Sequence, residues 1–285
     1  MKRLGAGVDN VAYLIDDLVV RFRRTDPGAV SREARVLRAV AAVSPIAVPV
    51  PEFVDPVGGC LAYRMLPGVP LLSVAGWDAG ELGRGLGRLL AALHALPASP
   101  LALHPLPASP LAGSPMAAES SSEAESLWET DDSVPQEWLD EALSLWPEVV
   151  AEVPAAWHGA VRAFLADPAP DPAPSPAFSH QDLGAEHVLV DPGTWEITGI
   201  IDWSDAAVGD PAQDLGLILR DLGPVAFAAA VEQIAPELRD PGIAERALFY
   251  ARCGLIADLA YGIATDQPVY REKSIAGLAR LFAPT

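Results

Sequence analysis

The stretch from Phe178 to Pro211 constrains this chain more than any other, because it predicts a short hairpin with an aspartate near each end. Residues 188–190, Val-Leu-Val, have the composition of a short buried strand, and the Asp-Pro-Gly sequence after them is typical of a turn. A second strand is expected to return from Ile197 to Ile201 and to end at Asp202. Because the hairpin folds back on itself, Asp202 should come close to Asp182, which precedes the first strand.

These side chains suit phosphoryl transfer. That reaction needs a carboxylate to accept the proton of an attacking hydroxyl, and ligands for the magnesium ion that accompanies the nucleotide phosphates. Asp182 could be the base, and His187 and Asp202 could be the metal ligands. Each residue alone has an ordinary structural explanation, as a hydrogen-bonded histidine or a turn-capping aspartate. Their joint spacing favours function.

Two other chemistries fit this stretch poorly. Ser179, His180 and Asp182 are too close in sequence to form a hydrolase triad, and the chain has no G-x-S-x-G elbow. His180 and His187 have neither an H-E-x-x-H motif nor a cysteine cluster to complete a zinc site. Serine hydrolysis and zinc chemistry are therefore set aside.

The His180-x-Asp182 motif, His187 after four more residues, and the strand-terminal Ile-Asp-Trp at 201–203 together resemble the catalytic region of aminoglycoside and macrolide phosphotransferases. The resemblance implies that Asp182 and His180 are catalytic, that His187 and Asp202 bind Mg²⁺, and that Asp214 braces the catalytic loop. Kinase-like enzymes more often carry Asn at the position of His187, and imidazole is a softer ligand than Mg²⁺ prefers. Histidine does occur there in the aminoglycoside 2''- and macrolide 2'-phosphotransferases.

The fold implied by this resemblance is α+β, bilobed and protein-kinase-like. A small N-terminal lobe with an antiparallel sheet and one helix would occupy residues 1–66 and bind nucleotide. A larger, mainly helical C-terminal lobe would occupy residues 67–285 and carry catalysis and substrate binding. Apolar residues at helical spacing predict its helices, at about residues 79–96, 137–150, 224–234, 244–263 and 272–282.

The beginning of the chain predicts a strand-loop-strand nucleotide clamp. Gly5 and Gly7 would form its phosphate-binding loop, although a G-x-G sequence alone is more often a hairpin turn. The strand that precedes this loop in kinase-like folds is expected to be almost absent. By resemblance, Arg21 holds the nucleotide phosphates, which a guanidinium group can bind as a fork. Glu33, on a helix from about Ser31 to Val43, would be its ion-pair partner.

The resemblance places the interlobe hinge after a predicted strand at residues 61–65. Backbone groups near Arg64 and Leu66 would bind the nucleotide base, and Tyr63 would limit the depth of the pocket. The alternative is an ordinary exit from a strand, which the following Pro and Gly residues also mark.

The segment from about residue 97 to 133 is expected to be a flexible linker. It is rich in Pro, Ala and Ser, becomes acidic towards its end, and contains the near-repeat LPASPLA at 96–102 and 106–112. The acidic helix expected after it, at 137–150, could present either a solvated face or a wall towards a substrate.

Charge is unevenly distributed along the chain. The net charge is −19, and residues 1–38 hold eight Lys/Arg against five Asp/Glu, which leaves +3 there and −22 on the remainder. Such an acidic remainder argues against nucleic acid and anionic membrane as partners and favours a cationic small molecule. Solubility alone is the competing explanation. No apolar run is expected to span a membrane, and the start of the chain lacks a signal-peptide core, so a cytoplasmic location is expected.

The expected function is therefore that of an antibiotic O-phosphotransferase. With Mg²⁺, it would move the γ-phosphate of ATP or GTP to a hydroxyl of an aminoglycoside and confer resistance. The resemblance implies that Asp205, three residues after Asp202, contacts substrate amines. The protein is expected to act as a monomer. Three alternatives stay open: a macrolide 2'-phosphotransferase, a small-metabolite kinase, and a pseudokinase that binds nucleotide without transfer.

Overall fold

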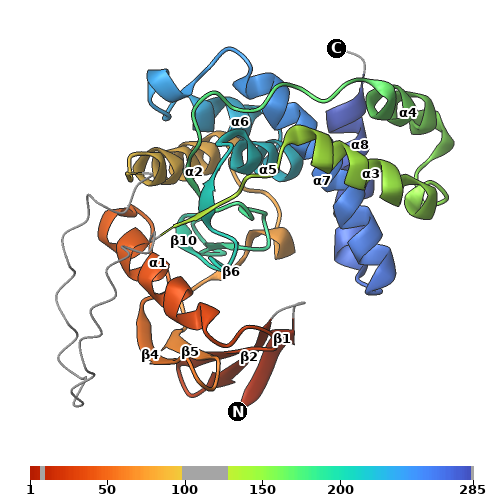
Figure 1. The fold of residues 1–285 in the computed structure, drawn as a ribbon. Coiled ribbons are helices and arrows are strands. Elements are labelled where there is room, and N and C mark those ends of the chain that lie inside the picture. The colour runs from red at the N-terminus through yellow and green to blue at the C-terminus, as the bar shows by residue number, and fades with distance from the viewer. Residues whose placement is uncertain (7–9, 98–127, 284–285) are drawn as a thin grey trace.

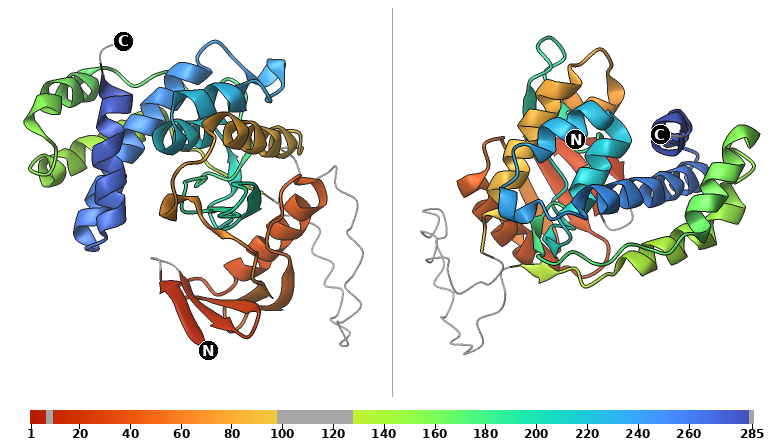
Figure 2. Two further views of the ribbon diagram at one scale, coloured as in Figure 1. Left: turned by 180° about the vertical axis from the view of Figure 1, so that it is seen from behind. Right: turned by 90° about the horizontal axis from the view of Figure 1, so that it is seen from above.

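The computed structural model describes residues 1–6, 10–97 and 128–283. A small sheet-bearing lobe lies at one end of the molecule and a larger helical lobe at the other, with short strands between them (Figures 1 and 2). The predicted α+β, two-lobed architecture is confirmed. The exact lobe boundary after residue 66 stays a prediction.

The N-terminal lobe is an antiparallel sheet of five strands in the order β1-β2-β3-β5-β4. One helix packs against it, with Val36, Leu37 and Val40 buried along its inner face. This stripe recurs every three to four residues, as one face of a helix requires. The elements are β1 (Lys2–Ala6), β2 (Asn10–Ile15), β3 (Leu18–Arg23), α1 (Ala29–Val43), β4 (Pro51–Asp55) and β5 (Cys60–Arg64).

The strand before the glycine loop is present, so the expectation that it would be almost absent is wrong. β1 is five residues long and pairs antiparallel with β2, from Lys2 opposite Leu14 to Ala6 opposite Val11. As an edge strand with exposed side chains, β1 is held by backbone hydrogen bonds to one neighbour. It therefore carries no apolar alternation that the sequence could reveal. Gly7 lies outside the described residues.

The C-terminal lobe is a set of packed helices. The long helix α7 lies against α3, α5 and α8, and α2 lies against α6. A Cβ on Gly83 or Gly87 of α2 would come within 2.2 or 2.5 Å of a backbone oxygen of α6, so the close approach of these helices needs glycine. The helices are α2 (Ala79–His94), α3 (Pro135–Val149), α4 (His158–Ala166), α5 (Ala212–Leu222), α6 (Pro224–Val231), α7 (Ile243–Ala264) and α8 (Pro268–Phe282), with 3₁₀ turns η1 (Leu71–Ser73), η3 (Ala155–Trp157) and η4 (Pro236–Leu238).

Helix α7 bears on the expectation that no apolar run spans a membrane. With 22 residues it is long and apolar enough to cross a membrane by length and composition. However, 61% of its most apolar window is buried inside the structure. That burial is typical of the core helix of a globular lobe.

Two small sheets lie between the lobes. One has the order β10-β9-β6 and contains the predicted hairpin, with Ile197 of β10 opposite Val190 of β9. The other has the order β7-β11-β8. Their strands are β6 (Val69–Pro70), β7 (Glu129–Thr130), β8 (Ala177–Ser179), β9 (Val188–Val190), β10 (Ile197–Ile200) and β11 (Ala207–Gly209).

The end of the predicted linker is packed. Trp128 is only 2% exposed, stacks on Phe178 with ring centroids 4.2 Å apart, and donates from Nε1 to the carbonyl oxygen of Pro97 (2.8 Å). Strand β7 follows it and pairs parallel with β11. The flexible-linker prediction is therefore wrong for residues 128–133, because one buried aromatic residue leaves no periodic signal in a sequence. The remainder, residues 98–127, lies outside the described residues.

Candidate active site

The loop after β8 is held by a buried carboxylate. Asp214, at the start of α5, is fully buried and accepts the backbone N–H of His180 (2.8 Å). Burial raises the pKa of Asp214 to about 7, although the backbone amides of His180, Leu183 and Gln181 stabilise its charged form. Gln181 has a φ of 69°, which turns the chain sharply before Asp182. Asp214 thus holds the loop in place, as was predicted. The turn at Gln181 directs Asp182 out of the loop.

His180, which was predicted to be catalytic, lies in the interior and not in the cleft, and its catalytic role stays a prediction. It is completely buried, and its Nε2 is 3.0 Å from the carbonyl oxygen of Ile201. Its Nδ1 accepts the backbone N–H of Asp182 (3.2 Å). Burial lowers the pKa of His180 to about 3, so the imidazole is neutral. His180 is thus a positioning residue that ties the catalytic loop to the end of β10.

Asp182, His187 and Asp202 come together as the hairpin predicts. Nδ1 of His187 is 3.3 Å from Oδ2 of Asp182, and Nε2 is 3.7 Å from Oδ2 of Asp202. The Nδ1–H also donates to the carbonyl oxygen of Asp182 (2.8 Å). The imidazole therefore lies between the two carboxylates, with Nε2 directed towards Asp202.

The three groups influence each other's protonation. Burial raises the pKa of Asp182, and the neighbouring His187 opposes that shift. Burial disfavours the charged form of His187, but Asp182 and Asp202 together raise the pKa of His187 above its ordinary value. For Asp202 burial is again unfavourable, but Arg21 and His187 lower the pKa of that carboxyl group. Asp202 is thus held in its ionised form, as a metal ligand should be.

Arg21 joins the two lobes through the predicted ion pair and a second one. Its Nη1 lies 2.6 Å from Oε1 of Glu33 on α1, and its Nη2 lies 2.9 Å from Oδ1 of Asp202. The Arg21 and Glu33 side chains are 8% and 4% exposed. Tyr63 is buried beside Arg21, and burial raises the pKa of its hydroxyl to about 12. The contact to Asp202 was not predicted, because no local spacing relates residues 181 positions apart.

The other two predicted hinge residues have different surroundings. The Arg64 side chain is exposed and pairs with Asp17 and, through Nε at 2.8 Å, with Glu52. Leu66 packs over Gly199 of β10, where an added Cβ would lie 2.7 Å from Leu66 Cδ1. The contact of the Arg64 and Leu66 backbone with a nucleotide base stays a prediction.

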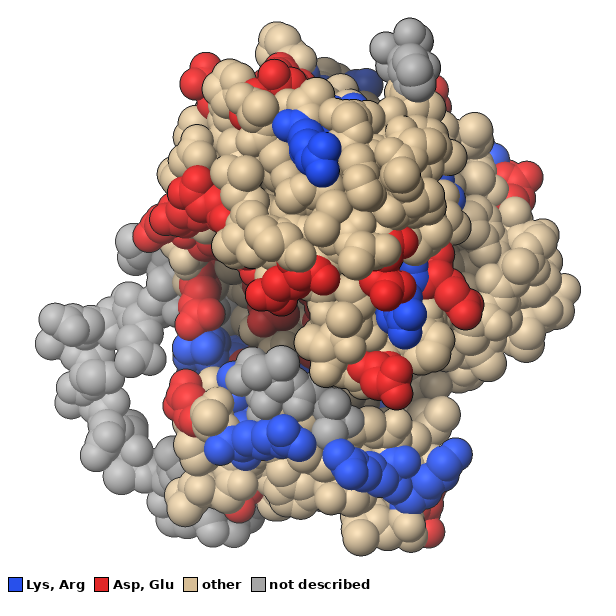
Figure 3. All heavy atoms as spheres, turned by 90° about the vertical axis from the view of Figure 1, so that its right-hand side faces the viewer, with Lys and Arg blue, Asp and Glu red and all other residues tan. Residues whose placement is uncertain are grey.

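A cavity of about 650 Å³ opens where these groups meet. The predicted residues Arg21, Asp182, His187, Asp202 and Asp205 line it, together with Gly5 of β1. Figure 3 shows the acidic side chains of the larger lobe facing a smaller lobe that carries basic ones. Glu33 stands behind Arg21, and His180, Tyr63, Arg64 and Leu66 are not among the lining residues. Sequence reasoning missed eight further residues that line the cavity: Asn10, Ala12, Glu186, Ser204, Asp258, Tyr261, Gln267 and Tyr270.

Helix α3 does not contribute to this cavity. Its acidic residues point into solvent, as the exposed Glu137, Asp140, Glu141 and Glu148 show. Of the two explanations for the acidic helix, the structure therefore favours the solvated face.

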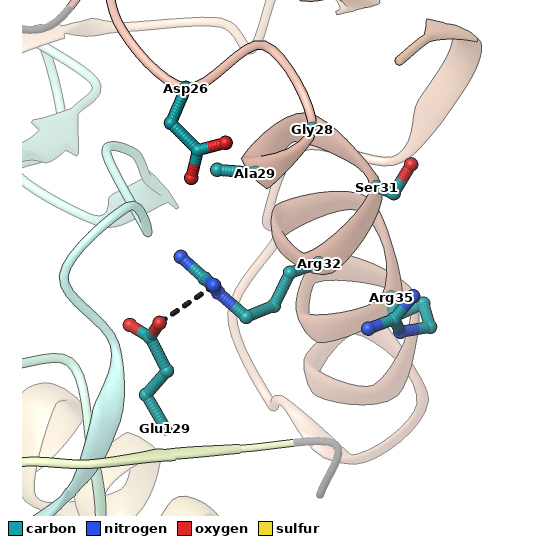
Figure 4. Close-up of a pocket in the computed structure, with 7 residues that line it drawn as sticks. All are labelled: Asp26, Gly28, Ala29, Ser31, Arg32, Arg35 and Glu129. Carbon is teal, nitrogen blue, oxygen red and sulfur yellow. Dashed lines mark ion pairs between the residues drawn. The ribbon is translucent and has the colours of Figure 1, made fainter. Parts of the chain in front are cut away.

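A second hollow, of about 520 Å³, lies at the start of α1. There Arg32 extends from α1 towards Glu129 of β7, and the two side chains form an ion pair of 2.7 Å (Figure 4). This pair links the α1 helix, which carries Glu33, to the larger lobe.

The cleft offers two neighbouring donors to a divalent cation, Nε2 of His187 and Oδ2 of Asp202. Within residues 1–6, 10–97 and 128–283, no group of three or more His, Cys, Asp or Glu side chains is arranged to hold a metal ion. Two protein ligands fit Mg²⁺ in nucleotide sites, where phosphate oxygens and water supply the remaining ligands.

Comparison with known proteins agrees with this geometry. The model of the phosphotransferase enzyme family, APH, matches residues 1–249. A search of curated proteins gives no significant match.

Similar solved structures cover almost the whole chain. The GDP and kanamycin complex of APH(2")-IIia is 19% identical with a TM-score of 0.66, over 97% of this chain and 91% of that one. Macrolide 2'-phosphotransferase MphH from Brachybacterium faecium is 25% identical with a TM-score of 0.55, over 100% and 92%. A choline/ethanolamine kinase family protein from Mesorhizobium loti is 22% identical with a TM-score of 0.51, over 98% and 86%.

The family match extends from β1 to the middle of α7 and so includes the clamp, the catalytic loop and the hairpin. The similar structures have the same kinase-like fold. This chain therefore belongs to the APH phosphotransferase enzyme family and is a kinase-type phosphotransferase.

Proposed function

We propose that this enzyme transfers the γ-phosphate of ATP or GTP to a hydroxyl of a cationic antibiotic, in the first place an aminoglycoside, and thereby confers resistance. The observation that carries the proposal is the charge of the cavity. One arginine lines it, Arg21, against five acids, namely Asp182, Glu186, Asp202, Asp205 and Asp258. An acidic cavity concentrates cationic ligands.

The donor follows from the fold and from the neighbours. One similar structure holds GDP with kanamycin, and another aminoglycoside phosphotransferase, APH(2'')-Ib, is described as ADP-bound. Both are products of a nucleoside triphosphate donor. Either purine nucleotide is therefore a candidate donor for this chain.

Asp182 would be the base in this mechanism. An acceptor hydroxyl donates to its carboxylate and attacks the γ-phosphorus. A bond forms between the acceptor oxygen and phosphorus, the bond from phosphorus to the β–γ bridging oxygen breaks, and ADP or GDP leaves with that electron pair. The hydroxyl proton passes to Asp182. Because partial burial raises the pKa of Asp182, the carboxylate is a better proton acceptor than an exposed aspartate.

Arg21, His187 and Asp202 would bind the phosphate end of the donor. The Arg21 fork, fixed by Glu33, contacts phosphate oxygens when its second partner, Asp202, turns to the cation. His187 and Asp202 would hold Mg²⁺, which neutralises charge that develops on the phosphates. The brace from Asp214 and the bond from His180 keep Asp182 in place during the reaction.

A macrolide is the second candidate acceptor, because the identity to macrolide 2'-phosphotransferase MphH, 25%, exceeds the 19% to APH(2")-IIia. The likeness to a choline/ethanolamine kinase family protein keeps a small cationic metabolite open as well. Cytoplasmic location and a monomeric state are further parts of the proposal.

The deciding experiment is a panel of aminoglycosides, macrolides and choline-like amines, each tested with ATP and with GTP in the presence and absence of Mg²⁺. We expect acceptor-dependent release of ADP or GDP with at least one aminoglycoside. Turnover of macrolides alone would replace the aminoglycoside assignment. Nucleotide binding without release for every acceptor would identify a pseudokinase.

A further inference from the structure

Lys273 of α8 places a buried ammonium group beside the cleft. Its Nζ lies 3.0 and 3.2 Å from the two carboxylate oxygens of Glu186 and 2.9 Å from Oδ2 of Asp258. The side chains of Lys273, Glu186 and Asp258 are 12%, 16% and 17% exposed. The same Nζ lies 4.8 Å from the centroid of the Tyr270 ring. Two carboxylates and an aromatic ring are the groups that recognise an ammonium ion.

Three of the groups around this ammonium belong to the cleft, whereas Lys273 itself and the more distant carboxylate of Asp221 (3.7 Å) do not. Glu186, Asp258 and Tyr270 line the 650 Å³ cavity, and Lys273 is absent from its lining. The lysine therefore reaches the two carboxylates from behind. Glu186, Asp258 and Tyr270 thus form a site for an ammonium group at the cavity wall, and the ammonium group of Lys273 already occupies it.

A buried network fixes this site to the catalytic loop. Arg220 pairs with Asp258 (2.9 Å) and, through two bonds of 2.7 and 3.0 Å, with Asp221. Asp221 also accepts the backbone N–H of Ala185 (3.0 Å), next to Glu186. The carboxylates are thus oriented before any ligand enters. Asp258 would keep Arg220 as a partner without Lys273, but Lys273 is the only ion-pair partner of Glu186 among the described residues. Loss of Lys273 would therefore leave a largely buried carboxylate without a cation, which is costly and which an added ammonium group would compensate.

We infer that Lys273 is a specificity-determining residue: its ammonium group fills the site formed by Glu186, Asp258 and Tyr270 and closes this side of the cleft to a cationic group of the acceptor. The inference rests on the proposed function in so far as the acceptor is cationic. Lys273 thereby limits how many cationic groups an acceptor can place in the cleft, because the acids on this side already have a partner. Replacing Lys273 by a neutral residue should open the site to a ligand ammonium.

The first test uses a small amine as a probe. Lys273→Ala removes three methylene groups and the ammonium group, which is the size of n-propylammonium. We expect n-propylammonium chloride to raise the melting temperature of Lys273→Ala saturably, with no saturable rise for the wild type or with 1-propanol. An equal response to 1-propanol, or no response to the amine, would overturn the ammonium site. If Lys273→Ala does not fold without amine, the refolding yield replaces the melting temperature as the measurement. A yield that rises with n-propylammonium but not with 1-propanol supports the site, and a yield that does not rise with n-propylammonium overturns it.

The second test addresses specificity. Lys273→Met keeps an unbranched side chain, one atom shorter, without the charge. Arg271→Met is the matched control, because Arg271 lies on the same helix and pairs with Glu152 outside the cleft (3.1 Å). Calorimetric binding of kanamycin and of a macrolide should show that Lys273→Met increases the preference for the multiply cationic kanamycin by about tenfold, the value of one added charged hydrogen bond. Arg271→Met should change it by less than about twofold.

The two variants separate a local effect from a general one. An equal increase in both would reflect the net charge alone and overturn the inference, as would an unchanged or decreased preference in Lys273→Met. Failure of the wild type to bind any antibiotic would count against the proposed function instead. In that case the n-propylammonium experiment still decides whether the ammonium site exists.

Discussion

The two ends of the cleft use the same kind of ion pair in opposite orientations. At the nucleotide end the cation, Arg21, lines the cavity and its acidic partner Glu33 stands behind it. At the other end the acids Glu186 and Asp258 line the cavity and the cation, Lys273, stands behind them. Each end thus neutralises its own buried charge. A phosphate is matched by Arg21 at one end, whereas at the other end Glu186 and Asp258 are already matched by the ammonium group of Lys273.

Asp182 lies between these two ends, and its loss should have the largest effect. Asp182→Asn keeps the size of the side chain but cannot accept the hydroxyl proton, so turnover should fall by about a hundredfold or more. Nucleotide affinity should stay nearly unchanged, because the phosphates bind Arg21 and the metal ligands. The measurement is steady-state release of nucleoside diphosphate together with calorimetric nucleotide binding. A variant that keeps more than about a tenth of wild-type turnover would show that Asp182 is not the base.

Arg21→Met tests the nucleotide end of the comparison. It removes the only cation among the described lining residues, so nucleotide affinity should fall by about thirtyfold, whereas acceptor affinity should change little. Arg21→Lys keeps the charge but loses the planar fork, so its nucleotide affinity should lie between those of the wild type and Arg21→Met. If Arg21→Met weakened acceptor and nucleotide equally, the two ends would not be electrostatically distinct.

Asp205→Ala sharpens the acceptor end of the comparison. Asp205 lines the cavity close to the strand end that carries Asp202, so its removal should raise the KM for a cationic acceptor about fivefold and leave the nucleotide KM nearly unchanged. The effect should shrink as salt is added, because screening weakens charge attraction in an open cleft. An acceptor KM that does not change would remove Asp205 from substrate recognition.

The smallest effect expected is on stability, and it comes from a histidine outside both ends. Burial lowers the pKa of His94 in α2 to about 4, below its ordinary 6.5. The unfolded chain therefore binds more protons between pH 6.5 and 4, and the stability present above pH 6.5 is lost as the pH falls through that window.

His94→Leu should reduce the dependence of the free energy of unfolding on pH by the equivalent of at most one proton. That corresponds to about 1.4 kcal/mol per pH unit, or roughly 2–4 °C in melting temperature for a chain of this size. Thermal unfolding of both proteins at pH 7 and pH 5 measures it. Identical pH slopes would show that His94 does not contribute, and His180 would then be the remaining buried histidine.

Local spacing predicted the centre of the site well and its borders poorly. The hairpin, with Asp182, His187 and Asp202 in contact, follows from period-two strands around a Pro-Gly turn. The Arg21–Glu33 pair followed from resemblance and is confirmed. The catalytic role of His180 stays a prediction; its burial in the core was not foreseen, since spacing cannot tell a side chain in the cleft from one directed into the core.

The sequence by itself determined the features that depend on residues close together along the chain. These are the strands, the helices, the catalytic hairpin and the acidic balance of the larger lobe. Only the tertiary structure decided which charges face the cleft and which stand behind them. Glu186, Asp258 and Lys273 come from a loop and two helices, up to 87 positions apart, and no motif joins them. The reason is physical: burial makes each of these charges costly alone, and the fold compensates that cost with a partner brought from a distant part of the chain.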